Sequence, residues 1–311
     1  MKELRKPPRL RPGDTIGIAA LAGPVDADRL EVGCQRLRAL GYRLRLARNL
    51  LVRCGTLGLA GSDVERHEAY RELLRNPEVR AILFARGGYG VTRVLPLLDP
   101  EEVGANLKIH CGFSDLTALS AFLLARCGIP SFHGPMVAAD LAAEPHQRTD
   151  AFFPSMLEGR GPAELALDEA DVLVPGDASG PLLGGCLSLL AAMAGTPDEP
   201  DYDGAVLFLE DLNEEAYRLD RMLGTLVYGG RFAKLRGILI GSLTGITFGG
   251  GEDAGRLRAL LLERLEPIGV PVVFGLPAGH TRPNVTLPLG ARVTWSCASR
   301  RLRFDEEIVT G

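Results

Sequence analysis

Apolar and polar positions along the first half of the chain alternate between two periods. Short apolar runs predict strands over residues 16–20, 42–46 and 80–84, whereas apolar residues at helical spacing predict helices over 28–40 and 63–75. Strands that alternate with helices are typical of βαβ units, which build a parallel sheet. Because ligands of such sheets bind at the carboxyl ends of the strands, we expect the loops after the strands to form one site.

The second half of the chain is less regular. Residues 142–180 contain Glu144-Pro145 and Pro175-Gly176-Asp177, which favour an interdomain connection with little regular structure. Beyond it, the pattern predicts helices over 180–194, 216–226 and 253–265, strands over 205–209, 237–240 and 270–274, and an antiparallel edge over 291–295 and 302–304. The sequence therefore predicts two domains, an N-terminal domain over 1–165 and a C-terminal domain over 181–311.

Residues 107–127 contain the sharpest change of period. An apolar run ends at Gly112 and a helical pattern begins at Leu116, with only three residues between them, among which are Ser114 and Asp115. A strand that becomes a helix within about three residues forms a nucleophile elbow, which exposes a side chain above the sheet. The second glycine of that motif is absent, because Leu116 occupies its position. From this stretch alone, helix capping by Ser114 and Asp115 is the favoured interpretation.

The loop after the third predicted strand reads Arg86-Gly87-Gly88-Tyr89-Gly90. Its glycines let the backbone approach a ligand closely and direct N–H groups toward it. The loop does not fit the dinucleotide fingerprint G-x-G-x-x-G, and it follows the third strand instead of the first. Two interpretations remain open, a ligand-binding loop and a flexible turn.

Size, charge and cysteine usage narrow the class of protein. The chain has 311 residues, which is long enough for two cores, and its net charge of −4 argues against a general nucleic-acid-binding protein. Six cysteines are scattered without a C-x-x-C pair, which predicts reduced thiols and gives no zinc signature. The N-terminus shows no apolar signal-peptide segment, and no apolar run approaches the roughly 20 residues of a membrane span. We therefore expect a cytoplasmic protein with no nucleic-acid or membrane partner.

Two polar residues of the second half are candidates for chemistry. Glu210 follows the predicted strand 205–209, and His280 closes a loop after the strand 270–274. Either residue can have a plain role, Glu210 as a capping or surface acid and His280 as a solvated imidazole. If Ser114 is a nucleophile, it needs a base within hydrogen-bond reach, and that base needs an orienting carboxylate. His280 and Glu210 are the best-placed candidates, although their spacing alone does not establish a triad.

Seven short motifs occur in order along the chain. They are Leu10-Arg-Pro-Gly-Asp-Thr-Ile, Arg86-Gly-Gly-Tyr-Gly, Gly112-Phe-Ser-Asp-Leu-Thr, His133-Gly-Pro-Met, Leu209-Glu-Asp, Tyr217-Arg-Leu-Asp-Arg-Met-Leu and Gly279-His-Thr-Arg-Pro-Asn-Val-Thr-Leu-Pro-Leu-Gly. In this order they resemble the LD-carboxypeptidase family of serine peptidases (murein tetrapeptide carboxypeptidases), which also contains the microcin C resistance proteins. The resemblance spans nearly the whole chain.

The resemblance implies a fold and a set of site residues. The implied fold is α/β, with an N-terminal doubly wound parallel sheet like that of class I glutamine amidotransferases and a smaller C-terminal swivelling β/β/α domain, usually in a homodimer. By motif, Ser114 is the expected nucleophile, His280 the base and Glu210 the carboxylate that orients it. The backbone amides of Gly88 and Asp115 are the expected oxyanion hole.

The resemblance also implies a substrate. Members of the family cleave the amide bond between the L-centre of a diamino acid and a terminal D-alanine in a cytoplasmic muropeptide, in peptidoglycan recycling, without a metal or an organic cofactor. Arg86 is our candidate for binding the free carboxylate of the D-residue. Two departures from the family pattern are Ala20-Leu21-Ala22-Gly23-Pro24, where Pro-Ser-Gly-Pro is frequent, and Cys186, where asparagine is usual. The second departure is expected to alter contacts near the substrate.

Two other functions remain open from the sequence. A microcin-C-type hydrolase would use the same triad on an acyl-sulfamoyl or acyl-phosphoramidate nucleotide, but such proteins typically carry an extra loop with an aromatic that stacks on the base. This chain is compact, and its only tryptophan, Trp295, lies in a predicted C-terminal strand. A non-catalytic small-molecule binding protein would leave Ser114 as a helix cap. Cys111 precedes the turn and is expected to be buried in the strand, which argues against it as the nucleophile.

Overall fold

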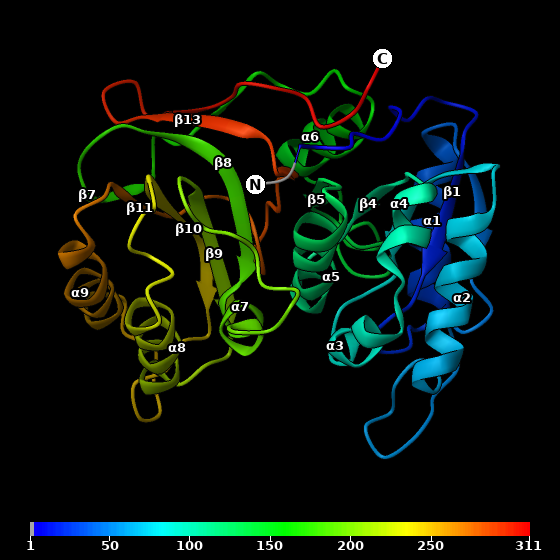
Figure 1. Cartoon of the computed structure of the whole chain (residues 1–311), viewed down its shortest axis with the longest axis horizontal. Helices are drawn as coiled ribbons and strands as arrows, with labels where there is room; N and C mark the ends of the chain where they lie inside the picture. Colours follow the sequence, from blue (N-terminus) through cyan, green and yellow to red (C-terminus); the bar gives the residue numbers. More distant parts are fainter. Residues whose placement is uncertain (1–2) are drawn as a thin grey trace.

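Two β-sheets lie side by side in the computed structural model, which describes residues 3–311 (Figure 1). The first sheet has the strand order β12-β5-β4-β3-β1-β2. Strands β1 to β5 run parallel, and β12 pairs with β5 in the antiparallel direction. The bounds are β1 Thr15–Ala19, β2 Arg43–Leu46, β3 Val79–Phe84, β4 Ile109–Cys111, β5 Ser131–His133 and β12 Leu287–Leu289.

Helices flank the strands of the first sheet, and β1 and β4 are buried along their whole length. A strand that is covered on both faces of a sheet is buried at successive positions, without an exposed residue at every second one. Helix α1 starts after Asp26, whose side chain accepts the Arg29 N–H, and α2 starts with a capping box of Ser62 and Glu65. The bounds are α1 Ala27–Ala39, α2 Asp63–Arg75, α3 Val91–Val94, η1 Leu95–Leu97, α4 Pro100–Ala105, η2 Ser114–Leu116, α5 Thr117–Phe122 and η3 Leu123–Cys127.

The second sheet has the strand order β6-β14-β13-β8-β9-β10-β11-β7. Its central strands β8 to β11 run parallel, and the outer strands on both sides are antiparallel. Helices α8 and α9 lie together on the side of this sheet away from the first one, at the left of Figure 1. The bounds are β6 Glu164–Ala166, β7 Asp171–Val174, β8 Ala178–Cys186, α7 Leu187–Met193, β9 Val206–Leu212, α8 Ala216–Tyr228, β10 Gly237–Thr244, α9 Ala254–Leu265, η4 Glu266–Ile268, β11 Val272–Phe274, β13 Arg292–Ser296 and β14 Arg301–Phe304.

The predicted α/β fold with a parallel sheet and two domains is confirmed, but two expectations for the middle of the chain are wrong. Residues 142–180 are not an irregular connection, because they form α6 (Gln147–Leu157), β6 and β7 and enter β8. The segment from Gly180 does not start a helix, since β8 continues to Cys186 and α7 begins only at Leu187. Strands of three or four residues, and a strand with three glycines, show too little apolar periodicity to be recognised.

The two sheets are joined beside the turn that carries Ser114. Helix α5 packs against β5 of the first sheet and against α7 and β8 of the second. At the start of α5, Thr117 Oγ1 accepts a hydrogen bond from the Cys186 N–H at 3.0 Å. A Cβ on Gly185 would lie 2.5 Å from the same oxygen, so only glycine allows this approach. Strand β12, which comes from the second half of the chain, also extends the first sheet.

Helix α1 passes so close to the segment after β5 that only glycine fits at position 33. A Cβ on Gly33 would lie 1.9 Å from Val137 O. We expect Gly33→Ala to lower the free energy of unfolding by about 3 kcal/mol, because helix and segment would have to separate. The matched control is Gly224→Ala in α8, where a Cβ meets nothing within 4 Å. It should raise stability by about 0.5–1 kcal/mol, because alanine is the better helix former. Urea unfolding measures both changes, and equal stabilities would contradict this packing.

Candidate active site

Ser114 occupies the turn between β4 and α5 in a conformation that serine rarely adopts. Its φ is 63°, in the left-handed region, which costs an L-residue about 1–2 kcal/mol. Neither η2 nor α5 has a side-chain hydrogen bond at its N-cap, so Ser114 is not a helix cap. Backbone strain of this kind concentrates at functional positions, and it marks Ser114 as a candidate.

The glycine-rich loop after β3 lies directly against Ser114. A Cβ on Gly87 would be 2.9 Å from Ser114 Oγ and 3.4 Å from the backbone N of Asp115. Any side chain at position 87 would therefore displace the serine hydroxyl. Gly88 follows with a φ of +121°, and its N–H donates to no backbone acceptor within residues 3–311. The loop thus presents main chain, not side chains, to the serine.

The buried Glu210 and the partly exposed His280 form a hydrogen-bonded pair at the second sheet. Glu210 Oε2 lies 2.6 Å from His280 Nδ1 and accepts the backbone N–H of His280 at 3.2 Å. The Glu210 side chain is 0 % exposed, and a Cβ on Gly279 would lie 2.7 Å from Oε2, so the loop reaches the carboxylate only with glycine at that position. The bond at Nδ1 leaves Nε2 as the imidazole nitrogen for a second partner.

Glu210 lies within a strand and not, as expected, directly after one. The apolar pattern ended the strand before this residue, but β9 continues to Leu212 and includes it. Within the sheet, Glu210 is the register partner of Cys186 on β8. The carboxylate is therefore fixed by a strand and not by a loop.

Ser114 and His280 line one cavity of about 470 Å³ between loops of the two halves. No hydrogen bond joins Ser114 Oγ to His280 in the described part of the chain. Catalytic contacts often tighten only in the substrate complex. The cavity is also lined by Val25, Asp26, Arg29, Arg86, Gly87, Gly88, Phe113, Met136, Ala138, Ala139 and Leu212. The structure thus brings the expected residues Arg86 and Gly88 to the same place as the serine and the histidine.

Aromatic rings support the imidazole of His280. The ring of Phe113 lies edge-on at 4.9 Å from it and 5.4 Å from the ring of His133, which in turn lies 4.9 Å from Phe208. Burial and the nearby His280 lower the pKa of His133 to about 3. His133 is therefore neutral near pH 7 and does not compete with His280 as a base.

Three further residues singled out from the sequence have clear positions. Arg86 Nη1 lies 3.5 Å from Pro24 O beside the cavity. Cys111 is 0 % exposed and burial raises the pKa of its thiol, which argues against it as a nucleophile. Cys186 is outside the cavity lining, and its Sγ lies 3.5 Å from Asp211 Oδ1.

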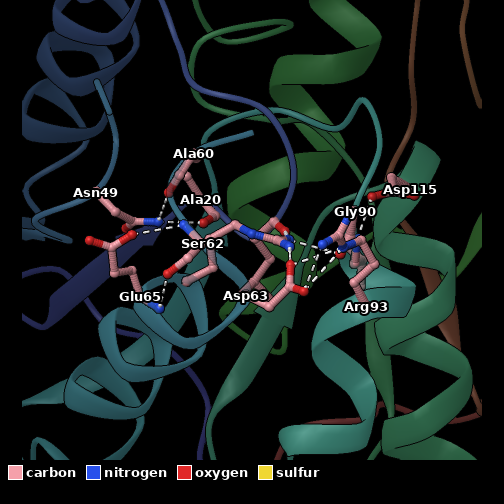
Figure 2. Close-up of polar contacts among 12 residues, drawn as sticks. Ala20, Asn49, Ala60, Ser62, Asp63, Glu65, Gly90, Arg93 and Asp115 are labelled. Atoms are coloured by element: carbon pink, nitrogen blue, oxygen red, sulfur yellow. Dashed lines mark hydrogen bonds and ion pairs between the residues drawn. The ribbon is translucent and has the colours of Figure 1, made fainter. Parts of the chain in front are cut away.

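A polar network behind the glycine-rich loop contains two charged side chains that the sequence analysis did not assign to the site (Figure 2). Arg66 of α2 is fully buried and donates to backbone carbonyls, among them Gly90 O at 2.7 Å. The Asp115 carboxylate accepts the Val91 N–H at 2.8 Å. Burial raises the pKa of Asp115 to about 6, although the Val91 hydrogen bond and the Arg66 charge act in the opposite direction.

One sequence signal could have revealed Arg66. It stands three, four and seven positions before Ala69, Tyr70 and Leu73, on the apolar face of the predicted helix 63–75. A charged residue on a buried face must find partners there. The side-chain role of Asp115 has no such signal, because its partner Val91 is distant in sequence.

Metal-binding clusters and membrane-spanning helices are not found in residues 3–311. No group of three or more His, Cys, Asp or Glu side chains that could hold a metal ion occurs there. No helix there combines the length and the hydropathy that crossing a membrane requires.

A strained serine that shares a cavity with a histidine–glutamate pair has the parts of a Ser-His-Glu triad, a class recognised by geometry and not by sequence position. The sequence matches the family model of the LD-carboxypeptidase N-terminal domain over residues 16–134. It matches the model of the LD-carboxypeptidase C-terminal domain over residues 179–295. The chain therefore belongs to the LD-carboxypeptidase family, and the resemblance noted in its sequence is confirmed.

Known relatives agree with this assignment. The chain is 40% identical to a putative carboxypeptidase of Streptomyces coelicolor, over 98% of this chain and 97% of that protein. It is 35% identical to a probable murein peptide carboxypeptidase of Bacillus subtilis, over 98% and 96%. Among solved structures, a muramoyltetrapeptide carboxypeptidase from Oxalobacter formigenes matches with a TM-score of 0.81 and 32% identity, over 95% and 100%. The apo microcin C7 self-immunity protein MccF has the same fold, with a TM-score of 0.90 at 24% identity, over 98% and 100%.

The strain at Ser114 gives a prediction that separates activity from stability. Ser114→Ala and Ser114→Gly both remove the hydroxyl, but only glycine adopts the left-handed conformation without steric cost. We expect Ser114→Gly to be more stable than Ser114→Ala by roughly 0.5–1 kcal/mol, after the larger chain entropy of glycine is subtracted. Thermal or urea unfolding of the two variants measures the difference. An alanine variant that is the more stable of the two would show that the backbone at this turn is not strained.

The raised pKa of Asp115 predicts a pH-dependent stability. The folded state keeps the Asp115 proton up to a pH of about 6, whereas the unfolded state loses it near 3.8. Between these values the folded state binds more protons, so the contribution of Asp115 to stability falls as the pH rises. Asparagine does not ionise, so the stability of Asp115→Asn relative to the wild type should rise by roughly 2 kcal/mol between pH 4 and pH 7. Urea unfolding at both pH values tests this, and a difference that stays constant would contradict it.

Proposed function

We propose that this chain is a serine-type LD-carboxypeptidase that releases terminal D-alanine from the L-centre of a diamino acid in muropeptides. The observation that carries the proposal is that Ser114 shares a cavity with His280, whose Nδ1 is bonded to the buried Glu210. The names of two relatives support the substrate class, since one is a probable murein peptide carboxypeptidase and another a muramoyltetrapeptide carboxypeptidase.

In the proposed mechanism, His280 Nε2 takes the proton of the Ser114 hydroxyl while Oγ attacks the carbonyl of the scissile amide. Glu210 Oε2 holds Nδ1 and stabilises the imidazolium that forms. The imidazolium then donates the proton to the leaving amine of D-alanine. A water molecule, activated by the same imidazole, releases the acyl group from Ser114.

The backbone amides of Gly88 and Asp115 are the proposed donors to the oxyanion of the tetrahedral intermediate. The closeness of position 87 supports this assignment, because a Cβ there would lie 2.9 Å from Ser114 Oγ and 3.4 Å from the Asp115 N, which places the glycine-rich loop beside the reacting oxygen. Each such donor contributes about 3–4 kcal/mol to the transition state.

The leaving D-residue carries a free carboxylate, and Arg86 is the proposed partner for it. Arg86 lines the cavity together with Ser114, and a guanidinium can bind a carboxylate through two parallel hydrogen bonds. The indole of Trp295 is 0 % exposed, so it cannot stack on the base of a nucleotide conjugate. A cytoplasmic location and a homodimer are further parts of the proposal, and both come from the family resemblance.

Incubation of the pure protein with a muramoyl or free tetrapeptide tests the proposed reaction. We expect mass spectrometry to detect the loss of one alanine, and only from a peptide with a terminal D-residue. Ser114→Ala should abolish this loss while its circular dichroism spectrum is unchanged, because removal of a triad nucleophile costs several orders of magnitude in turnover.

Two results would refute the proposal. One is near-wild-type turnover of the folded Ser114→Ala variant, which would exclude the serine as the nucleophile. The other is an intact tetrapeptide in a reaction where the same enzyme preparation hydrolyses an acyl-sulfamoyl nucleotide, which would move the substrate to the nucleotide class.

A further inference from the structure

Two loops of the cavity meet at the point where the strand order of the first sheet reverses. In the order β2-β1-β3-β4-β5, strands β1 and β3 are neighbours. Open α/β sheets bind their ligands outside the carboxyl ends of the strands at such a point. The loop after β1 contributes Asp26 to the cavity, and the loop after β3 contributes Gly88.

Arg66 reaches both loops from α2. Its Nη1 donates to Leu21 O in the first loop and, at 2.7 Å, to Gly90 O in the second. Its Nη2 pairs with Asp63, one turn earlier on the same helix. Because the side chain is 0 % exposed, these oxygens replace water as the partners of the charge. A Cβ on Gly90 would lie 2.9 Å from Nη1, so glycine at this position makes room for the guanidinium.

Asp115 holds the other side of the same peptide group. Its Oδ2 accepts the N–H of Val91 at 2.8 Å, while the carbonyl of that peptide group, Gly90 O, accepts from Arg66 (Figure 2). One peptide unit is therefore fixed by two buried charged side chains, which come from α2 and from the turn after β4. It lies two residues after Gly88, and Asp115 directly follows Ser114.

We propose that Arg66 and Asp115 are positioning residues that hold the glycine-rich loop so that the Gly88 N–H meets the oxyanion formed at Ser114. The proposal rests on the proposed function and deepens it. Neither side chain lines the cavity, so neither touches the substrate. Since the oxyanion exists only near the transition state, a displacement confined to the Gly88–Val91 end of the loop, which leaves Arg86 in place, should lower kcat and leave KM nearly unchanged. A displacement of about 1 Å can cost about 100-fold in rate.

The Asp115 pair of variants gives the sharpest test. Asp115→Ala removes the acceptor for the Val91 N–H, whereas Asp115→Asn keeps an amide oxygen that can accept it. We expect kcat to fall about 100-fold in Asp115→Ala with KM within about threefold of the wild type, and to fall less than about fivefold in Asp115→Asn. Rescue by the conservative variant identifies the hydrogen bond, not the volume of the side chain, as the cause.

Arg66 is tested with a matched control from the same helix. Arg66→Lys keeps the positive charge, but a single ammonium group cannot reach both loops and Asp63 as the planar guanidinium does. We therefore expect a partial loss of kcat in Arg66→Lys. The control is Arg71→Met, because Arg71 pairs with Glu102 at 2.8 Å and with Glu68, and within residues 3–311 it makes no hydrogen bond to either loop. It should keep the wild-type kcat.

A second readout makes the test independent of the substrate. The rate constant for phosphonylation of the Ser114 hydroxyl by a fluorophosphonate depends on the oxyanion hole, because the phosphoryl oxygen occupies it. We expect this rate to fall in Asp115→Ala in parallel with kcat and to stay unchanged in Arg71→Met. The proposal is overturned if the folded Asp115→Ala variant reacts as fast as Arg71→Met, or if Asp115→Asn loses as much as Asp115→Ala. Rapid labelling of a wild-type enzyme that leaves the tetrapeptide intact would refute the substrate assignment alone.

Discussion

The arrangement of the site depends on one hydrogen-bonded pair, the buried Glu210 with the partly exposed His280. A carboxylate that is fully buried costs several kcal/mol unless it is bonded. Oε2 is bonded to both the ring Nδ1 and the backbone N–H of His280, whereas the buried Oε1 has no hydrogen-bond partner within residues 3–311. This double contact fixes the imidazole in orientation as well as in position. It also explains why glycine precedes the histidine, because a Cβ on Gly279 would collide with the carboxylate. The second half of the chain, with its central parallel strands, presents this pair to the serine of the first half.

The first half contributes a strained turn and the loops that surround it. Ser114 is held at positive φ, a Cβ at position 87 would collide with its hydroxyl, and the segment around Gly90 is held by buried charges. Local conformations of this kind are unfavourable in isolation, and they persist because packed elements on both sides determine them. Helix α5 connects the serine turn of the first half with the second half of the chain, since it starts after the turn and packs against both sheets. The hydrogen bond from the Cys186 N–H to Thr117 Oγ1 links the two sheets three residues after Ser114.

Much of the fold and of the candidate site could be predicted from the sequence. The features that could not be predicted were missed for physical reasons. The helix predicted over 63–75 agrees with α2, because an apolar stripe and a capping box define it. The predicted elbow agrees with the turn at Ser114, although the residues alone favoured a helix cap. Strands β6 and β7 were missed because edge strands of three or four residues carry no detectable period. The partnership of Glu210 with His280 joins residues 70 positions apart, and the residues made it only a candidate until the motifs suggested a family. The link between Asp115 and Val91 depends on the packing of a loop, for which no sequence spacing exists.

In the proposed mechanism, Ser114, His280 and Glu210 act as one unit across the two halves of the chain. The most direct measurement of this claim is the turnover of His280→Ala, Glu210→Gln and the double variant on the same tetrapeptide. Residues that act as a unit show strongly non-additive effects. We expect the turnover of the double variant to lie within about threefold of that of His280→Ala, because the carboxylate acts only through the imidazole. Rate losses that multiply in the double variant would show that Glu210 acts independently of His280, and they would exclude a common unit of the three residues.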